Sequence, residues 1–215
     1  MFNSLQVRVF IKSSSIKFFC QVLLPSSKLL NLNTLYKAWA SVNHLHIHSM
    51  NVPYQLGMDI CPSLPLNKSE TTDDVINGTI RQMNPSRTLF DGFVLNSKSE
   101  DDIEQIVSLM DKMINYFHDN EIPYNVVWSR GSDINANGDL ETALVRVFIW
   151  PRFSGEGLLP HPAFDNACAE LGGHLPIKTR EEFDKLTGES ALERLHTSKL
   201  TQEKFDSILK DFVKF

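Results

Sequence analysis

The segment that decides the fold and the chemistry of this 215-residue chain is Ala40-Ser41-Val42-Asn43-His44-Leu45-His46-Ile47-His48. Side chains along a β-strand point alternately to the two faces of the sheet. As a strand, this segment carries its three histidines on one face, and Asn43, Leu45 and Ile47 on the other. Three of the seven histidines of the chain would therefore lie on one face of the strand, and the opposite face would pack against the core. A histidine-rich surface strand is the plainer alternative.

Three histidines on one strand face are first considered as metal ligands. Positions i and i+2 lie about 6.6 Å apart, and i and i+4 about 13 Å apart, whereas a Zn–N bond is about 2 Å long. Two of these imidazoles can converge on one ion but three in a row cannot, so no metal is expected. The second candidate is nucleophilic catalysis, in which a neutral imidazole attacks phosphorus while neighbouring donors neutralise the developing charge.

The run His44-Leu-His-Ile-His48 resembles the His-φ-His-φ-His signature of the histidine-triad superfamily of nucleotide hydrolases and transferases. The longer run from Trp39 to His48 is similar to the animal GDP-D-glucose phosphorylases, which are relatives of the plant GDP-L-galactose phosphorylases. Three later stretches resemble the same family in the same order: Tyr124-Asn-Val-Val-Trp-Ser-Arg-Gly131, Arg146-Val-Phe-Ile-Trp-Pro-Arg152 and Glu170-Leu-Gly-Gly-His-Leu-Pro-Ile177. The resemblance covers residues 37–215 and does not cover residues 1–36.

This resemblance implies a role for individual residues and for the whole chain. The implied nucleophile is His46, its catalytic neighbours are His44 and His48, the phosphate-binding residues are Ser41 and Asn43, and the candidates for a supporting position behind them are Glu170 and His174. A structural role is the more frequent one for histidines such as His161 and His174. The implied reaction transfers GMP from GDP-glucose to inorganic phosphate, giving GDP and glucose 1-phosphate, without a cofactor. The alternatives are a nucleotide hydrolase and an inactive fragment that only binds nucleotide.

Composition limits the partners and the compartment. A net charge of −5 argues against nucleic acid as the main partner, because binding to a phosphate backbone favours a basic face. No apolar stretch approaches 18 residues, so no membrane span is expected. The three cysteines, Cys20, Cys61 and Cys168, are widely spaced and odd in number, which favours a reducing, cytoplasmic compartment. The sequence leaves a homodimer open.

Residues 1–36 differ in composition from the rest of the chain. They contain no Asp or Glu, and their Lys and Arg residues alternate with serines and apolar residues, as in a transit peptide. The alternative is a start that is not native to the fold, which the mature protein keeps. Short strands are expected at residues 7–11 and 17–24.

The remaining pattern predicts an α+β fold of the histidine-triad-like kind, with an antiparallel sheet and helices packed on one face. An irregular connection that acts as a flap or tether is expected over residues 53–69, and a strand over 88–95. A helix should follow from Ser97 or Ser99 as N-cap, with a buried stripe of seven residues: Ile103, Ile106, Val107, Met110, Met113, Ile114 and Phe117.

The second half of the chain predicts two strands at residues 124–129 and 143–150, paired antiparallel. Arg130, Arg146 and Arg152 lie on or near them; a solvated surface position is the more frequent role for each, and binding of a phosphate is the alternative. A short helix at residues 162–171, a short strand at 174–177, a helix opened by a capping box at Thr179 and a last helix from Thr201 complete the expectation.

Overall fold

The computed structural model describes residues 29–33, 47–50, 54–66, 79–99, 101–134, 140–154 and 160–215. The strands expected at residues 7–11 and 17–24 lie outside these ranges. So do four of the candidate site residues: Ser41, Asn43, His44 and His46.

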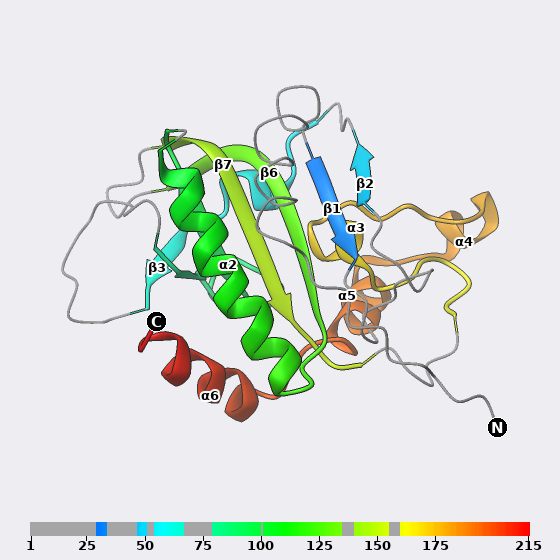
Figure 1. Ribbon diagram of the computed structural model, residues 1–215. Helices are drawn as coiled ribbons and strands as arrows, with labels where there is room; N and C mark the ends of the chain where they lie inside the picture. Colours follow the sequence, from blue (N-terminus) through cyan, green and yellow to red (C-terminus); the bar gives the residue numbers. More distant parts are fainter. Residues whose placement is uncertain are drawn as a thin grey trace.

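A seven-stranded antiparallel sheet forms the centre of the described structure, with strand order β2-β1-β6-β7-β5-β4-β3 (Figure 1). The strands are β1 (Leu29–Asn33), β2 (Ile47–Met50), β3 (Ser63–Pro65), β4 (Arg81–Met83), β5 (Phe93–Ser97), β6 (Tyr124–Ile134) and β7 (Leu140–Pro151). The helices are η2 (Gly57–Ile60), α2 (Asp102–Asp119), α3 (Cys168–Leu171), α4 (Arg180–Lys185), α5 (Gly188–His196) and α6 (Gln202–Phe212). No helix among the described residues has the length and apolar character needed to cross a membrane.

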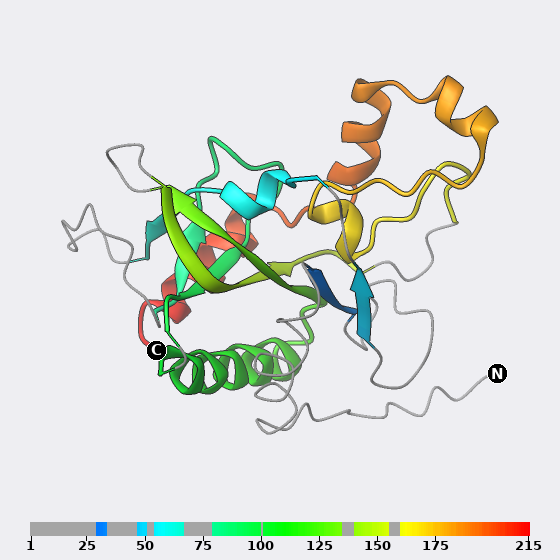
Figure 2. The same cartoon turned by 90° about the horizontal axis from the view of Figure 1, so that it is seen from above.

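Alternate residues of the central strands bury two different faces. On β6, Val126 and Trp128 pack with α2 and α6, whereas Val127 packs with η2, α3 and α5. The two longest helices therefore lie on one face, as Figures 1 and 2 show, and the expected α+β fold is confirmed. The other face, here called the α3 face, is covered by the shorter elements η2, α3 and α5.

Helix α2 has the apolar stripe that its sequence predicts, because all seven residues of the stripe are buried. The predicted N-cap is wrong. The helix begins after Asp101, and the carboxylate of Asp102 accepts hydrogen bonds from the backbone N–H groups of Lys98 and Ser99 at 2.9 and 3.0 Å. The carboxylate of Asp102, in the first turn of the helix, thus holds the preceding loop, and neither Ser97 nor Ser99 is needed as an N-cap.

The strand expected at residues 88–95 begins later, at Phe93. Residues before it form a turn in which the hydroxyl of Thr88 donates to the carbonyl oxygens of Asn84 and Phe90. Gly92 then passes so close to β7 that a Cβ atom there would lie 2.7 Å from Trp150. Gly92 is already bonded to β4, since its carbonyl oxygen accepts a hydrogen bond from the backbone N–H of Met83 at 2.9 Å, and the close contact leaves no room for a side chain there.

The antiparallel pair expected at residues 124–129 and 143–150 is confirmed, and both strands are longer than predicted. The pairing register shifts between Ser129 and Gly131. At Gly131 a Cβ atom would lie 2.2 Å from the carbonyl oxygen of Asp59 in η2. The glycine is needed because the backbone of η2 rests directly on the strand.

Three other expectations change. The connection over residues 53–69 is no flap where it is described, because Leu56, Met58 and Cys61 are buried. The short helix covers only Cys168–Leu171, since the side chain of Asn166 instead bonds to residues of the 194–198 segment. No strand forms at residues 174–177. The N-caps Thr179 and Thr201 are confirmed, and each accepts a hydrogen bond from the backbone N–H three residues later.

Candidate active site

The described part of the histidine segment is its end, which forms the edge strand β2. His48 pairs with Asn31 of β1, and Asn31 pairs with Val127 of β6. Directly paired residues of antiparallel strands lie on the same face of a sheet. The row of positions that begins at His48 therefore continues through Val127 and Phe148, which both lie on the α3 face.

Two buried arginines, Arg146 of β7 and Arg152 directly after it, hold the segments that cover this face. Arg146 is fully buried, and its guanidinium donates to the carbonyl oxygens of Met58, Asp59 and Cys61 at 2.7–3.2 Å. It also donates to the carbonyl oxygen of Ser132. Arg146 thus fixes the η2 turn over β6, and the prediction of a surface position is wrong for it.

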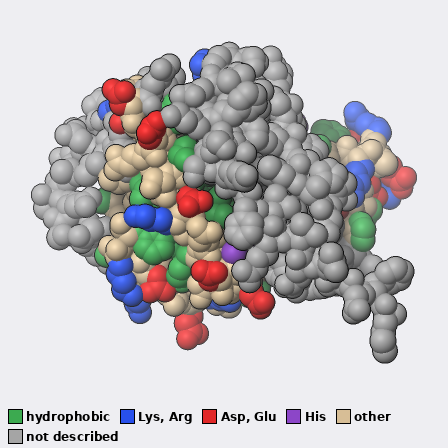
Figure 3. Space-filling view, viewed as in Figure 1, with side chains coloured by type: hydrophobic (Ala, Val, Ile, Leu, Met, Phe, Trp, Pro, Cys, Tyr) green, Lys and Arg blue, Asp and Glu red, His purple; other side chains and the backbone are tan. Residues whose placement is uncertain are grey.

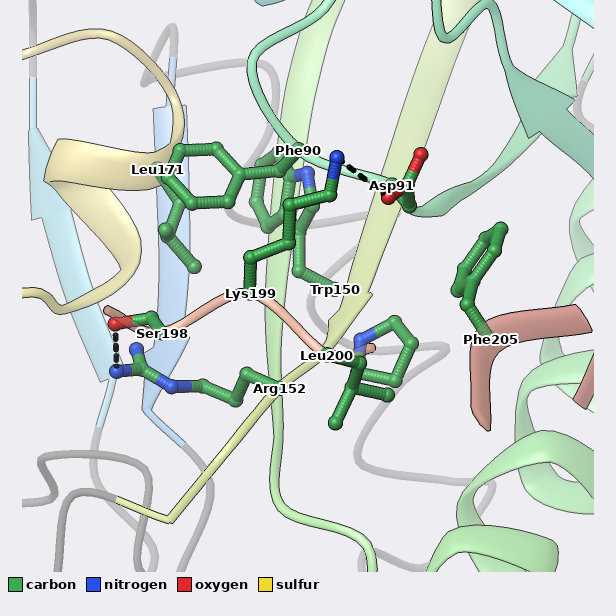
Figure 4. A pocket seen from close by; sticks show the side chains of 10 residues that line it. Phe90, Asp91, Trp150, Arg152, Leu171, Ser198, Lys199, Leu200 and Phe205 are labelled. Atoms are coloured by element: carbon green, nitrogen blue, oxygen red, sulfur yellow. Dashed lines mark hydrogen bonds and ion pairs between the residues drawn. The ribbon is translucent and has the colours of Figure 1, made fainter. Parts of the chain in front are cut away.

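Arg152 has the corresponding role beside α3. One of its Nη atoms donates to the side-chain oxygen of Asn125 at 2.8 Å and to the carbonyl oxygen of Asn166, and the other donates to the Ser198 hydroxyl at 2.7 Å. Figure 4 shows this guanidinium beside Ser198. Burial lowers the pKa of Arg152 to about 10. Of the three arginines considered, only Arg130 is exposed.

Both buried arginines escape sequence analysis for the same reason. The partners of Arg146 are mainly backbone carbonyl groups, and those of Arg152 are a carbonyl group and the side chains of Asn125 and Ser198. These partners are uncharged and belong to segments that are distant in sequence, so no charged residue at a characteristic spacing predicts them. A buried guanidinium is tolerated when its donors are satisfied in this way.

A buried carboxyl group and a buried thiol lie near Arg152. Glu170 accepts a hydrogen bond from the backbone N–H of Ala167 at 3.0 Å and thereby caps α3. Burial raises its pKa to about 7, despite hydrogen bonds from backbone N–H groups and the nearby Arg152, which lower it. Burial also raises the pKa of Cys168 to about 12, so this thiol is not a reactive nucleophile.

His174 hydrogen-bonds through Nδ1 to the hydroxyl of Tyr54, 120 residues earlier. Between α3 and this histidine, Gly173 has a φ of +94°, a conformation that glycine adopts readily. The structure therefore brings Glu170 and His174 together around α3, which packs against β1 and β6. His161 has a local contact instead, since its Nδ1 accepts from the backbone N–H of Ala163.

A small cavity lies on the far side of Arg152 and is shown in Figure 4. Its volume of about 10 Å³ accommodates about one water molecule. The ion pair between Lys199 and Asp91 closes it at 2.9 Å. Near it, the indole N–H of Trp150 is buried without a hydrogen-bond partner among the described residues. This cavity is too small for a nucleotide.

Among the described residues on the face seen in Figure 3, acidic and basic side chains are intermixed, and no patch of one charge is present. The chemical features of the described structure are therefore concentrated on the α3 face, at the row that includes His48. Sequence reasoning gave no role there to Tyr54 or Asn125, and it gave binding of a phosphate only as the alternative for Arg152. Asn125 and Arg152 had a signal, because both lie in stretches that resemble the family.

Comparison with solved structures defines the class of fold. The chain superimposes on the crystal structure of yeast Ap4A phosphorylase Apa2 in complex with AMP, with a TM-score of 0.57 and 18% sequence identity. The match covers 91% of this chain and 66% of the yeast protein. The fold is thus the α+β fold of the histidine-triad-like class, as expected.

Comparison of sequences gives the family. Residues 86–214 match the family described as GDPGP1-like, C-terminal domain, and the chain belongs to this family. Similar curated proteins include GDP-D-glucose phosphorylase 1 of Bos taurus, with 34% identity over 71% of this chain, and those of Homo sapiens and Danio rerio, with 29% and 30% identity over 79% and 82% of it. The matches cover 38%, 42% and 48% of these relatives, so the chain spans less than half of their length.

Proposed function

We propose that the chain carries the catalytic strand of a GDP-D-glucose phosphorylase, which transfers GMP from GDP-glucose to inorganic phosphate. The observation that carries this proposal is the position of β2, in which Ile47 and His48, the end of the histidine segment, pair with Leu32 and Asn31 of β1. The names of the relatives supply the substrates, and the proposed catalytic region is residues 37–215. The proposal includes a cytoplasmic location, which the odd number of cysteines supports.

Beside the described end of the histidine segment, β1 continues to Asn33, whose partner on β6 is Asn125. Asn125 is the residue that Arg152 binds. The described residues next to the proposed site therefore include a buried, hydrogen-bonded pair, and the alternation of side chains along a strand gives the three histidines of the sequence one face.

The proposed reaction has two steps. A ring nitrogen of His46 attacks the α-phosphorus of GDP-glucose; a P–N bond forms, the P–O bond to glucose 1-phosphate breaks, and glucose 1-phosphate leaves. An oxygen of inorganic phosphate then attacks the same phosphorus, the P–N bond breaks, and GDP is released. His44 and His48 orient the nucleophile and exchange protons, and Ser41 and Asn43 bind phosphate oxygens.

Glu170 and His174 have supporting roles in this proposal. Glu170 caps α3, which packs on β1 next to the proposed catalytic strand. His174, which follows α3, hydrogen-bonds to Tyr54, which follows β2. Neither residue needs to touch the reacting phosphorus.

Product analysis separates the phosphorylase from the hydrolase alternative, because both reactions pass through the same covalent intermediate. We expect GDP and glucose 1-phosphate when GDP-glucose and phosphate are supplied together. GMP as the main nucleotide product, unchanged by phosphate concentration, would show that water is the acceptor. Calorimetry with GDP tests the binding-only alternative, since binding at micromolar Kd, about −8 kcal/mol, without turnover would support it.

A further inference from the structure

The aromatic ring of Tyr54 is exposed to solvent, and its hydroxyl group is held by a hydrogen bond. The residue is 52% exposed, and its hydroxyl is hydrogen-bonded to Nδ1 of His174. The two ring centroids lie 6.0 Å apart with the planes inclined at 41°, so the imidazole does not stack flat on the phenol ring. The hydrogen bond uses only the hydroxyl, and this leaves ring surface available to a ligand.

The position of this ring relates it to the candidate active site. Tyr54 follows the end of β2 by four residues, and Leu56, two residues further on, is buried on the α3 face. Its partner His174 follows α3, which covers the same face. Tyr54 therefore stands on the side of the sheet to which the row of His48 belongs. Six residues of chain span at most about 20 Å, so the ring lies no farther than this from the end of that row.

A second large exposed aromatic ring with a defined contact has a different setting. Phe183 of α4 is 58% exposed, and its ring face is covered by the guanidinium of Arg180 at 5.3 Å. Helix α4 buries none of its residues, and Figure 2 shows it projecting away from the sheet. Phe183 has similar exposure without a link to the catalytic strand, so it is a matched control.

We infer that Tyr54, held by His174, is the stacking platform for the purine base of the nucleotide. This inference rests on the proposed function, since it needs a nucleotide at the histidine face. A planar base stacks on an aromatic ring through dispersion and electrostatic attraction, and removal of such a ring weakens binding markedly. The tether to His174 keeps the ring oriented before the ligand arrives, which lowers the entropy lost on binding.

Calorimetric titration of GDP into the full chain tests the inference with four variants. Tyr54→Ala and Tyr54→Leu should each weaken GDP binding roughly tenfold or more, because neither side chain has an aromatic face. Tyr54→Phe keeps the ring and should bind within about threefold of the unchanged protein. Phe183→Ala should bind GDP like the unchanged protein. Far-ultraviolet circular dichroism establishes that each variant is folded.

A second measurement reports the contact itself. A nuclear Overhauser effect between the H8 proton of bound GDP and the ring protons of Tyr54 is expected, and a purely structural tyrosine would not give one. GDP binding by Tyr54→Leu that equals that of the unchanged protein would overturn the platform while the proposed function stands. Failure of the unchanged protein to bind either GDP or GDP-glucose would overturn both.

Discussion

Arg146 and Arg152 act as structural cations at the scale of single residues. Arg146 is buried on β7 and Arg152 directly after its end, and each satisfies its donors with oxygen atoms of segments that cover the α3 face. Their guanidinium groups can therefore not be released to bind a phosphate without loss of these segments.

Arg146→Lys should destabilise the fold strongly. A lysine keeps the charge but cannot reach the four carbonyl oxygens that Arg146 binds, and buried acceptors would lose their donors. We expect the free energy of unfolding in urea to fall by about 3 kcal/mol or more. Arg130→Lys, at the exposed neighbouring position, should change it by less than about 0.5 kcal/mol. Equal effects of the two substitutions would contradict the structural role.

Glu170 makes stability depend on pH. Its pKa is about 7 in the folded protein against an ordinary value of 4.5, so the folded state binds the proton more tightly than the unfolded state. Ionisation of buried Glu170 therefore lowers the free energy of unfolding. This loss is absent below pH 4.5, grows as the pH rises and is complete above about pH 7.

Glu170→Gln should remove this loss while keeping an acceptor for the Ala167 N–H. Relative to the unchanged protein, the variant should gain up to about 3 kcal/mol of unfolding free energy between pH 4.5 and pH 8. Urea unfolding at both pH values measures the gain. Glu189→Gln, on the exposed surface of α5, serves as the control. A difference between variant and unchanged protein that is the same at both pH values would show that Glu170 has no raised pKa.

At the scale of elements, η2 and β6 are in backbone contact at Gly131. Gly131→Ala would force a Cβ atom to within 2.2 Å of the Asp59 carbonyl oxygen, and the neighbouring atoms are also backbone. We expect a loss of about 2 kcal/mol or more, with η2 displaced from the strand. Gly188→Ala meets no atom within 4 Å and lies in a helix, so it should be neutral or stabilising by up to about 1 kcal/mol. Similar unfolding midpoints for the two variants would refute the close contact.

Sequence periodicity predicted the elements whose signal is local. The stripe from Ile103 to Phe117 sets helix α2, and the alternating apolar residues of β6 and β7 set the central antiparallel pair. Caps made by a side chain and a backbone N–H three residues later, at Thr179 and Thr201, were also predictable.

Elements whose form depends on distant contacts were not predictable. Gly92 has no room for a side chain because Trp150 lies against it, and Asn166 shortens α3 because its side chain bonds to the 194–198 segment. The burial of Arg146 and Arg152 depends on carbonyl groups that only the folded chain brings together. For the candidate site, the histidine segment, Glu170 and His174 were proposed from the sequence. Tyr54, the hydrogen-bond partner of His174, had no signal in the sequence.

At the scale of the whole molecule, one sheet connects the candidate catalytic strand to the rest of the described structure. β2 lies at its edge, next to β1, which in turn pairs with β6, and the helices α2 and α6 support the face opposite the α3 face. The chain spans less than half of the relatives to which it is similar. The central claim is that this sheet holds a histidine able to carry GMP.

Trapping of the covalent intermediate tests this claim most directly. GDP-glucose labelled in the guanosine moiety is incubated with the purified chain without phosphate, and the protein is then denatured in alkali and analysed by mass spectrometry. The account predicts one GMP attached to the peptide that contains His46, released as GDP when phosphate is added before denaturation. It also predicts no label on a folded His46→Ala variant. Label on that variant equal to the label on the unchanged protein would contradict the assignment of the nucleophile.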